Sequence, residues 1–83
     1  MTNEDIKAMI ERGLPQSQAF ISGDGTHFAA KVVSDAFEGL PLIKQHRLVY
    51  GALGNSFENA LHALSIQTFT VAEWERQKAF QTL

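Results

Sequence analysis

The chain has 83 residues, of which 45% are apolar and 19% charged, a composition typical of one small globular domain. Its formal charge of −2 provides no overall positive field that would attract nucleic-acid phosphates. The absence of cysteine excludes disulfides and any iron-sulfur cluster held by thiolates of this chain. No apolar run suits a signal peptide or a membrane span, so we expect one cytoplasmic domain, residues 1–83, without membrane contact.

The first half of the chain predicts a helix followed by a hairpin. Apolar residues recur at helical spacing between a cap at residue 2 or 3 and Gly13. The segment "SQAFIS" favours a strand, and the glycines of "GDG", residues 23–25, suit a tight turn. The returning strand is predicted over 26–34, where alternation places His27 on the face opposite to Phe28.

The second half predicts two helices, a strand and a last helix. The first helix follows Pro41 and ends at Gly54, and a short one follows a cap at residue 55 or 56. Alternation in "HALSIQTF", residues 62–69, indicates the third strand. A capping box over 70–73, with a hydrophobic staple of Phe69 and Trp74, begins the last helix at residue 71. The predicted buried stripe of the helix after Pro41 consists of Leu42, Ile43, His46, Val49, Tyr50 and Leu53.

These elements give the order αββααβα, an α+β fold class. A hairpin followed by a crossover through two helices makes the third strand parallel to one of the first two. We therefore expect a three-stranded mixed sheet packed against helices. His46 belongs to the apolar stripe of its helix, so we interpret it as a packed core or boundary histidine and not as a ligand.

Several segments occur together in a specific order. They are "SGDGTHF" with "VVSDAFEG", then "KQHRLVYGAL", then "HALSIQTFT" leading into "AEW". In this order and spacing the chain resembles the BolA family over almost its whole length, and its short "GDG" turn is similar to that of the small acid-resistance branch of bacterial BolA proteins. The resemblance implies a fold similar to the type II KH domain, in agreement with the predicted element order.

The resemblance also implies a function and its residues. It implies a non-catalytic adaptor that binds a monothiol glutaredoxin, with glutathione, through a shared 2Fe-2S cluster, in iron-sulfur trafficking or in iron or stress regulation. It implies His62 as a cluster ligand and His27 as a candidate second ligand, for which an exposed histidine that touches only water is the alternative. Because the chain lacks cysteine, the partner must supply sulfur, and the isolated chain should be a cluster-free monomer or weak homodimer.

The alternative function is a KH-like, nucleic-acid-binding transcriptional regulator of the stress response, since some bacterial members of the family are described as DNA-binding. Residues 51–54 match the G-x-x-G loop of KH domains, but their apolar centre favours a structural role. Lys31, Lys44 and Arg47 are the candidate phosphate contacts, and so few cations predict weak, salt-dependent binding. No nucleophile with a base and no motif around a carboxylate pair is found, so we do not expect an enzyme.

Overall fold

The computed structural model describes residues 2–24, 26–54 and 64–81. Its helices are α1 (Asn3–Gly13), α2 (Leu42–Leu53) and α3 (Val71–Gln81), and its strands are β1 (Gln18–Gly23), β2 (Phe28–Val33) and β3 (Leu64–Phe69). A short 3-10 helix, η1 (Asp35–Phe37), lies between β2 and α2. The short helix predicted after residue 55 lies outside the described residues. None of the described helices combines the length and apolarity needed to cross a membrane.

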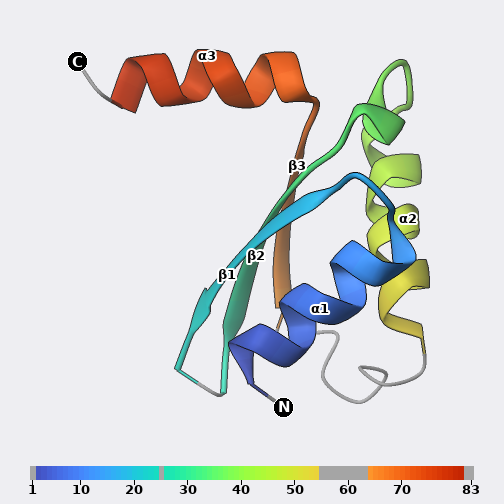
Figure 1. Cartoon of the computed structure of the whole chain (residues 1–83), viewed down its shortest axis with the longest axis vertical. Helices are drawn as coiled ribbons and strands as arrows, with labels where there is room; N and C mark the ends of the chain where they lie inside the picture. The colour runs from blue at the N-terminus through green and yellow to red at the C-terminus, as the bar shows by residue number, and fades with distance from the viewer. Residues whose placement is uncertain (1, 25, 55–63, 82–83) are drawn as a thin grey trace.

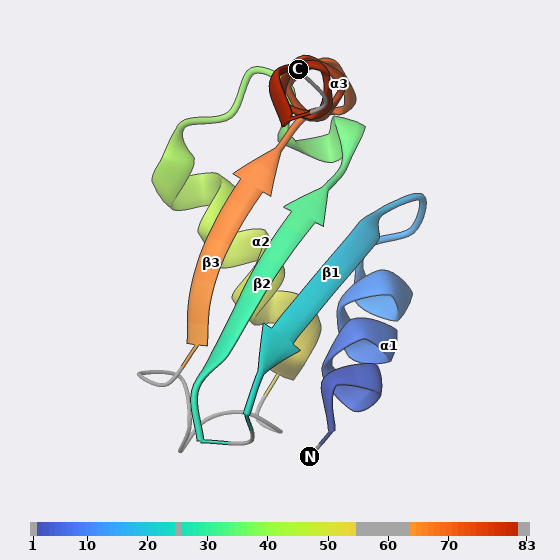
Figure 2. The ribbon, with the colours of Figure 1, turned by 90° about the vertical axis from the view of Figure 1, so that its left-hand side faces the viewer.

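The sheet has the order β1-β2-β3, with β1 antiparallel and β3 parallel to β2. This confirms the predicted mixed sheet and the crossover. Helices α1 and α2 cover one face, which we call the inner face, and α3 extends to the other side from the end of β3 (Figures 1 and 2). The hairpin turn between β1 and β2 therefore lies at the end of the sheet away from α3 (Figure 2).

The core fills the space between the inner face and the helices α1 and α2. Ile6 and Ile10 of α1 are fully buried, as their helical spacing predicts. Phe37 is also fully buried, because η1 folds it back into the core, and the Ser34 hydroxyl caps η1 by accepting from the Ala36 N–H at 3.1 Å. The remaining core side chains are Leu14, Ala19, Phe28, Ala30, Val32, Val49, Leu53 and Leu64.

The first turn of α2 does not pack as its apolar pattern predicts. Leu42 and Ile43 are each 62% exposed, so their assignment to the buried stripe was wrong. The polar side chain of Gln45 makes the link to the neighbouring segments, since it donates to the carbonyls of Phe37 and Leu40 and accepts from the Thr68 hydroxyl. The Gln45 amide thus provides the hydrogen-bond donor for two backbone carbonyls next to η1.

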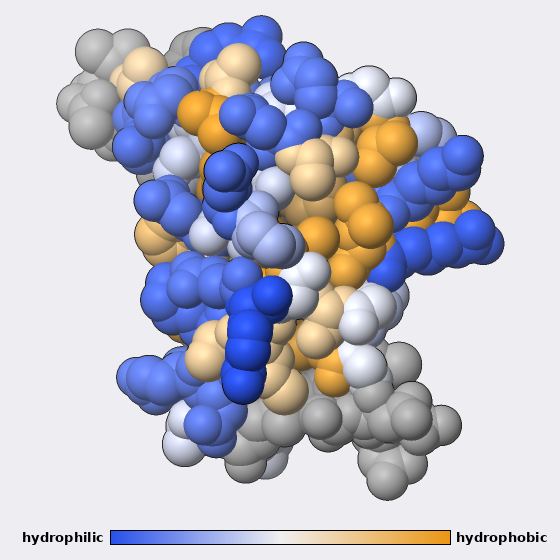
Figure 3. All heavy atoms as spheres, turned by 45° about the vertical axis from the view of Figure 1, so that its right-hand side comes forward, coloured by the Kyte–Doolittle hydropathy of each residue, from blue (hydrophilic) through white to orange (hydrophobic). Residues whose placement is uncertain are grey.

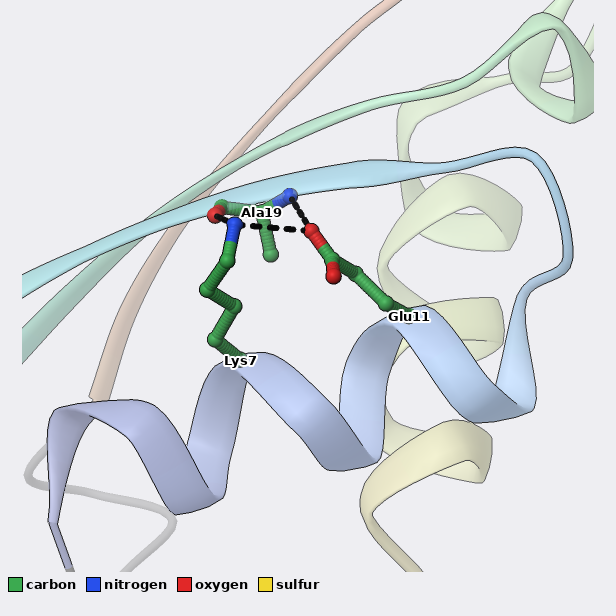
Figure 4. Close-up of polar contacts among 3 residues, drawn as sticks. All are labelled: Lys7, Glu11 and Ala19. Carbon is green, nitrogen blue, oxygen red and sulfur yellow. Dashed lines mark hydrogen bonds and ion pairs between the residues drawn. The ribbon is translucent and has the colours of Figure 1, made fainter.

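Helix α1 is fastened to the outer edge of β1 by two side chains (Figure 4). The Lys7 ammonium donates to the Ala19 carbonyl and to the Glu11 carboxylate, both at 2.9 Å, and that carboxylate accepts from the Ala19 N–H at 3.0 Å. The bond from Lys7, followed by that from Ala19, holds the pKa of Glu11 below its ordinary value. We call this arrangement the edge clamp, because it supplies the donor and acceptor that a neighbouring strand would otherwise provide.

The ends of the helices follow the local signals of the sequence. The Thr2 hydroxyl and the Asp5 carboxylate form a capping box at the start of α1. Thr70 and Glu73 form the predicted box at the start of α3, and the rings of Phe69 and Trp74 lie 5.2 Å apart as the predicted staple. Trp74 also stacks on Phe20 of β1 at 5.0 Å, which anchors α3 to the outer face of the sheet.

We predict that Glu11→Ala lowers the free energy of unfolding by about 1–2 kcal/mol, because the Ala19 N–H loses its acceptor. Urea denaturation followed by circular dichroism measures the loss. The matched control is Glu75→Ala, which removes an exposed ion pair to Lys78 and should cost less than about 0.5 kcal/mol. Equal losses in the two variants would show that the edge clamp is worth no more than a surface ion pair.

Candidate functional site: the hairpin turn and the histidines

His27 lies in the turn between β1 and β2, one residue before β2 begins. The prediction that it belongs to the strand was wrong. The Asp24 carboxylate accepts from the N–H of Thr26 at 3.0 Å, from the Thr26 hydroxyl at 2.7 Å and from the N–H of His27 at 3.1 Å. Because the His27 N–H bonds to this side chain and not to a strand, the alternation of β2 does not extend to His27.

The entry to the turn depends on glycine at position 23. Gly23 has a φ of +146°, which L side chains rarely adopt, and a Cβ there would lie 2.2 Å from the His27 carbonyl oxygen. The Asp24 N–H donates to that same carbonyl at 3.3 Å. The backbone on both sides of His27 is therefore fixed by short-range bonds.

The His27 ring is exposed, and its Nδ1 lies 3.5 Å from the Thr26 hydroxyl oxygen. That hydroxyl already gives its hydrogen to Asp24, so its oxygen is free to accept from an Nδ1–H. In the tautomer with the proton on Nδ1, the ring would donate to this hydroxyl. The Nε2 lone pair is then available to a ligand from outside the chain.

The Asp24 carboxylate is held in its charged form. The Thr26 hydroxyl, followed by the N–H groups of Thr26 and His27, holds the pKa of Asp24 well below its ordinary range. Since the pKa of the folded state is lowered, the turn is at full strength above the ordinary aspartate pKa of about 4 and weakens as the pH falls towards the lowered value. The turn thus keeps its form at neutral pH.

His62, the other predicted ligand, lies outside the described residues, so its position relative to His27 stays a prediction. The described strands show that the chain enters β2 and β3 at the same end of the sheet, because Phe28 and Leu64 are paired in the parallel ladder (Figure 2). His27 directly precedes Phe28 in the sequence, and His62 comes two residues before Leu64.

His46 lies elsewhere, half-buried on α2 in a groove that it forms with Leu42, Ile66 and Phe69. This agrees with a boundary histidine. No group of three or more His, Asp or Glu side chains that could hold a metal ion is found among residues 2–24, 26–54 and 64–81.

The structure does not bring the three candidate phosphate contacts together. Lys31 pairs with Phe20 across the hairpin and lies on the outer face of the sheet, whereas Lys44 and Arg47 are exposed on α2, which covers the inner face. Lys44 and Arg47 are three positions apart on one helix, but the sheet separates both from Lys31. A single patch of all three cations is therefore absent from this fold.

The G-x-x-G segment at the end of α2 has a structural role. Leu53 is 2% exposed and belongs to the core. Ala52 packs closely on Gly13 of α1, since a Cβ added at position 13 would lie 2.6 Å from the Cβ of Ala52. Gly54 ends the helix with a φ of +59°, and its N–H donates to the Tyr50 carbonyl. Ala52 and Leu53, which lie between the two glycines, thus pack within the fold.

The spacing that fixes the turn was present in the sequence but not used. In "DGTH" the aspartate precedes the threonine by two residues and the histidine by three, which is the spacing of an Asx turn. The flanking glycines alone predict Asp24 only as a turn residue. Its role as the acceptor that orients the Thr26 hydroxyl and the His27 backbone became clear from the hydrogen bonds.

The fold and the turn define a small α+β protein with a mixed sheet and an exposed histidine on a fixed hairpin. A family model described as BolA-like protein matches residues 7–73. The acid stress protein IbaG of Escherichia coli (strain K12) is 35% identical over 79 residues, which make up 94% of this chain and 94% of that protein. The chain therefore belongs to the BolA-like protein family.

Solved structures agree with this assignment. A bolA protein homologue from Coxiella burnetii is 46% identical and superposes with a TM-score of 0.81, covering 90% of this chain and 97% of the other. The BolA domain of SufE1 from Arabidopsis thaliana is 35% identical with a TM-score of 0.69, covering 86% and 93%. The α+β fold is thus that of BolA proteins.

We predict that the Asp24 carboxyl titrates with a midpoint well below the ordinary aspartate value of about 4, because three donors stabilise its charged form. Carbon-13 NMR of the side-chain carboxyl measures this midpoint as a function of pH. Thr26→Val keeps the shape of the side chain but removes the hydroxyl, so it should raise the midpoint. An ordinary midpoint in the unsubstituted protein would contradict the turn described above.

Proposed function

We propose that this protein is a non-catalytic, cytoplasmic adaptor that binds a monothiol glutaredoxin, with its glutathione, through a shared 2Fe-2S cluster. In this proposal His62 donates an imidazole nitrogen to a cluster iron, and His27 is the second candidate ligand. The observation that carries it is the exposed His27 ring on a fixed turn, in a chain that belongs to the BolA-like family. The proposed process is iron-sulfur cluster trafficking or the iron and stress regulation that depends on it.

The donor set of the chain fits a shared cluster and not a resident one. A 2Fe-2S cluster needs four ligands, which are thiolates in most proteins and include two imidazoles in Rieske centres. This chain has no cysteine and only three histidines, of which His46 is half-buried in its own groove. The sulfur ligands must therefore come from the partner, and a glutaredoxin cysteine with glutathione would provide them.

The turn would contribute to cluster binding by preparing one nitrogen. A neutral imidazole binds iron through the nitrogen that carries no proton, and a bond to the other nitrogen sets its orientation. The Thr26 hydroxyl lies beside Nδ1 of His27, and Asp24 orients that hydroxyl. This supports Nε2 as the nitrogen that meets the cluster.

We predict that His62→Ala abolishes the spectral change seen when this protein is mixed with a cluster-loaded monothiol glutaredoxin, and that His27→Ala weakens or shifts it. Visible absorption and circular dichroism follow the complex. The matched control is His46→Ala, which removes a histidine that lies in the groove beside the carboxyl end of β3. If His62→Ala leaves the spectrum of the complex unchanged, the ligand assignment fails.

The second candidate function is a KH-like nucleic-acid-binding regulator, supported by the exposed cations Lys44 and Arg47 on α2. A mobility-shift series at two salt concentrations tests it. Binding through α2 predicts that Lys44→Ala and Arg47→Ala each weaken the shift, while Lys31→Ala, on the other side of the sheet, has a smaller effect. The absence of any shift at low salt would eliminate this candidate.

A further inference from the structure

Helix α2 has an exposed face that combines apolar and basic side chains. We call this face the α2 surface, and it consists of Ile43, Lys44, Arg47, Leu48 and Gly51. Ile43 is 62% exposed and Leu48 is 36% exposed, although both are large apolar residues. In Figure 3, which looks towards the helical side of the molecule, hydrophobic surface lies directly beside strongly hydrophilic side chains. Isolated exposed apolar residues are common, but two that flank a pair of cations on one helix form a patch.

The charge on this helix has one sign. Helix α2 contains two of the chain's seven Lys and Arg residues and none of its nine Asp and Glu residues. Neither Lys44 nor Arg47 forms an ion pair with any residue in the described ranges. The protein as a whole is acidic, whereas α2 is net positive and also has exposed apolar side chains.

Gly51 is the second observation. It lies in the last turn of α2, where a helical glycine has a higher backbone-entropy cost than alanine, and a Cβ at this position would meet nothing within 4 Å. Its φ is not positive, so neither a turn nor steric crowding within the described residues requires it. Position 51 follows Ile43 and Arg47 along one ridge of the helix, at spacings of four residues, so this exposed ridge has no side chain at position 51.

We propose that the α2 surface is a docking site for an amphipathic helix of a partner protein that carries Asp or Glu residues beside its apolar stripe. The apolar stripe would pack on Ile43 and Leu48, the acids would meet Lys44 and Arg47, and Gly51 would let the two helices approach closely. A nucleic-acid partner suits this surface less well, because phosphate contacts gain nothing from exposed isoleucine and leucine. This site does not depend on cluster ligation, since it lies on a different element from the hairpin.

The test uses the full chain and a synthetic helical peptide of roughly 20 residues, made of Leu, Ala and Glu with its leucines at helical spacing. A peptide of the same composition, scrambled so that the leucines share no face, is the control ligand. Titrations followed by nitrogen-15 NMR should move the amide signals of α2 with the first peptide and not with the second. A single-stranded oligonucleotide forms the third arm.

Two variants make the result specific. The double variant Lys44→Glu with Arg47→Glu should weaken peptide binding at least about tenfold, whereas Arg76→Glu, an exposed charge reversal on α3, should change it less than about twofold. Gly51→Gln should raise the midpoint of thermal unfolding, since glutamine is the better helix former, and yet weaken binding at least about tenfold. A packing role for Gly51 alone would not produce these opposite effects.

Three outcomes would overturn the proposal. They are the absence of shifts in α2 with the amphipathic peptide, equal binding of the scrambled peptide, and tighter binding of the oligonucleotide than of the peptide. Because Gly51→Gln is expected to gain stability, weaker binding by this variant cannot be attributed to unfolding. None of these outcomes bears on the cluster ligands, which the absorption experiment tests separately.

Discussion

The edge clamp between Lys7, Glu11 and Ala19 is the interaction on which the arrangement of the molecule depends. The two side chains form hydrogen bonds to the N–H and the carbonyl of Ala19 in β1. They thereby hold α1 against an edge of the sheet to which another strand could otherwise pair. Fastened there, α1 directs its buried isoleucines into the core and brings Gly13 against Ala52. The position of α2, and with it the α2 surface, follows from this close contact.

The same construction brings the hairpin and the start of β3 to one end of the sheet. Helices α1 and α2 lie along the inner face, while the hairpin and the start of β3 lie at the end of the sheet opposite to α3 (Figure 2). There the chain uses Gly23 and Asp24 to hold an exposed histidine. A protein that lends one or two nitrogen ligands to a partner's cluster needs such a presented ring, and it needs no enclosed catalytic pocket.

The sequence predicted most of the fold because the signals that decide it are local. The capping boxes, the staple and the glycine turn each depend on residues within five positions of one another. The failures involved side chains that replace backbone partners. Asp24 accepts from the N–H of His27, and the alternation ends there. In the first turn of α2, Gln45 makes the hydrogen bonds to η1 and β3, while Leu42 and Ile43 are exposed. Such side-chain hydrogen bonds cannot be predicted from hydrophobic periodicity. The pairing of His27 with His62 remains a prediction.

The proposed function requires that this chain supply an imidazole nitrogen to an iron of the shared cluster. The most direct test labels only the histidines of this protein with nitrogen-15, forms the complex with an unlabelled cluster-loaded monothiol glutaredoxin, reduces it, and records pulsed electron paramagnetic resonance spectra. The account predicts a nitrogen-15 hyperfine coupling of the strength expected for a bound imidazole, because His62 or His27 lies in the first coordination sphere. A reduced cluster in a stable complex without any nitrogen-15 coupling would contradict it.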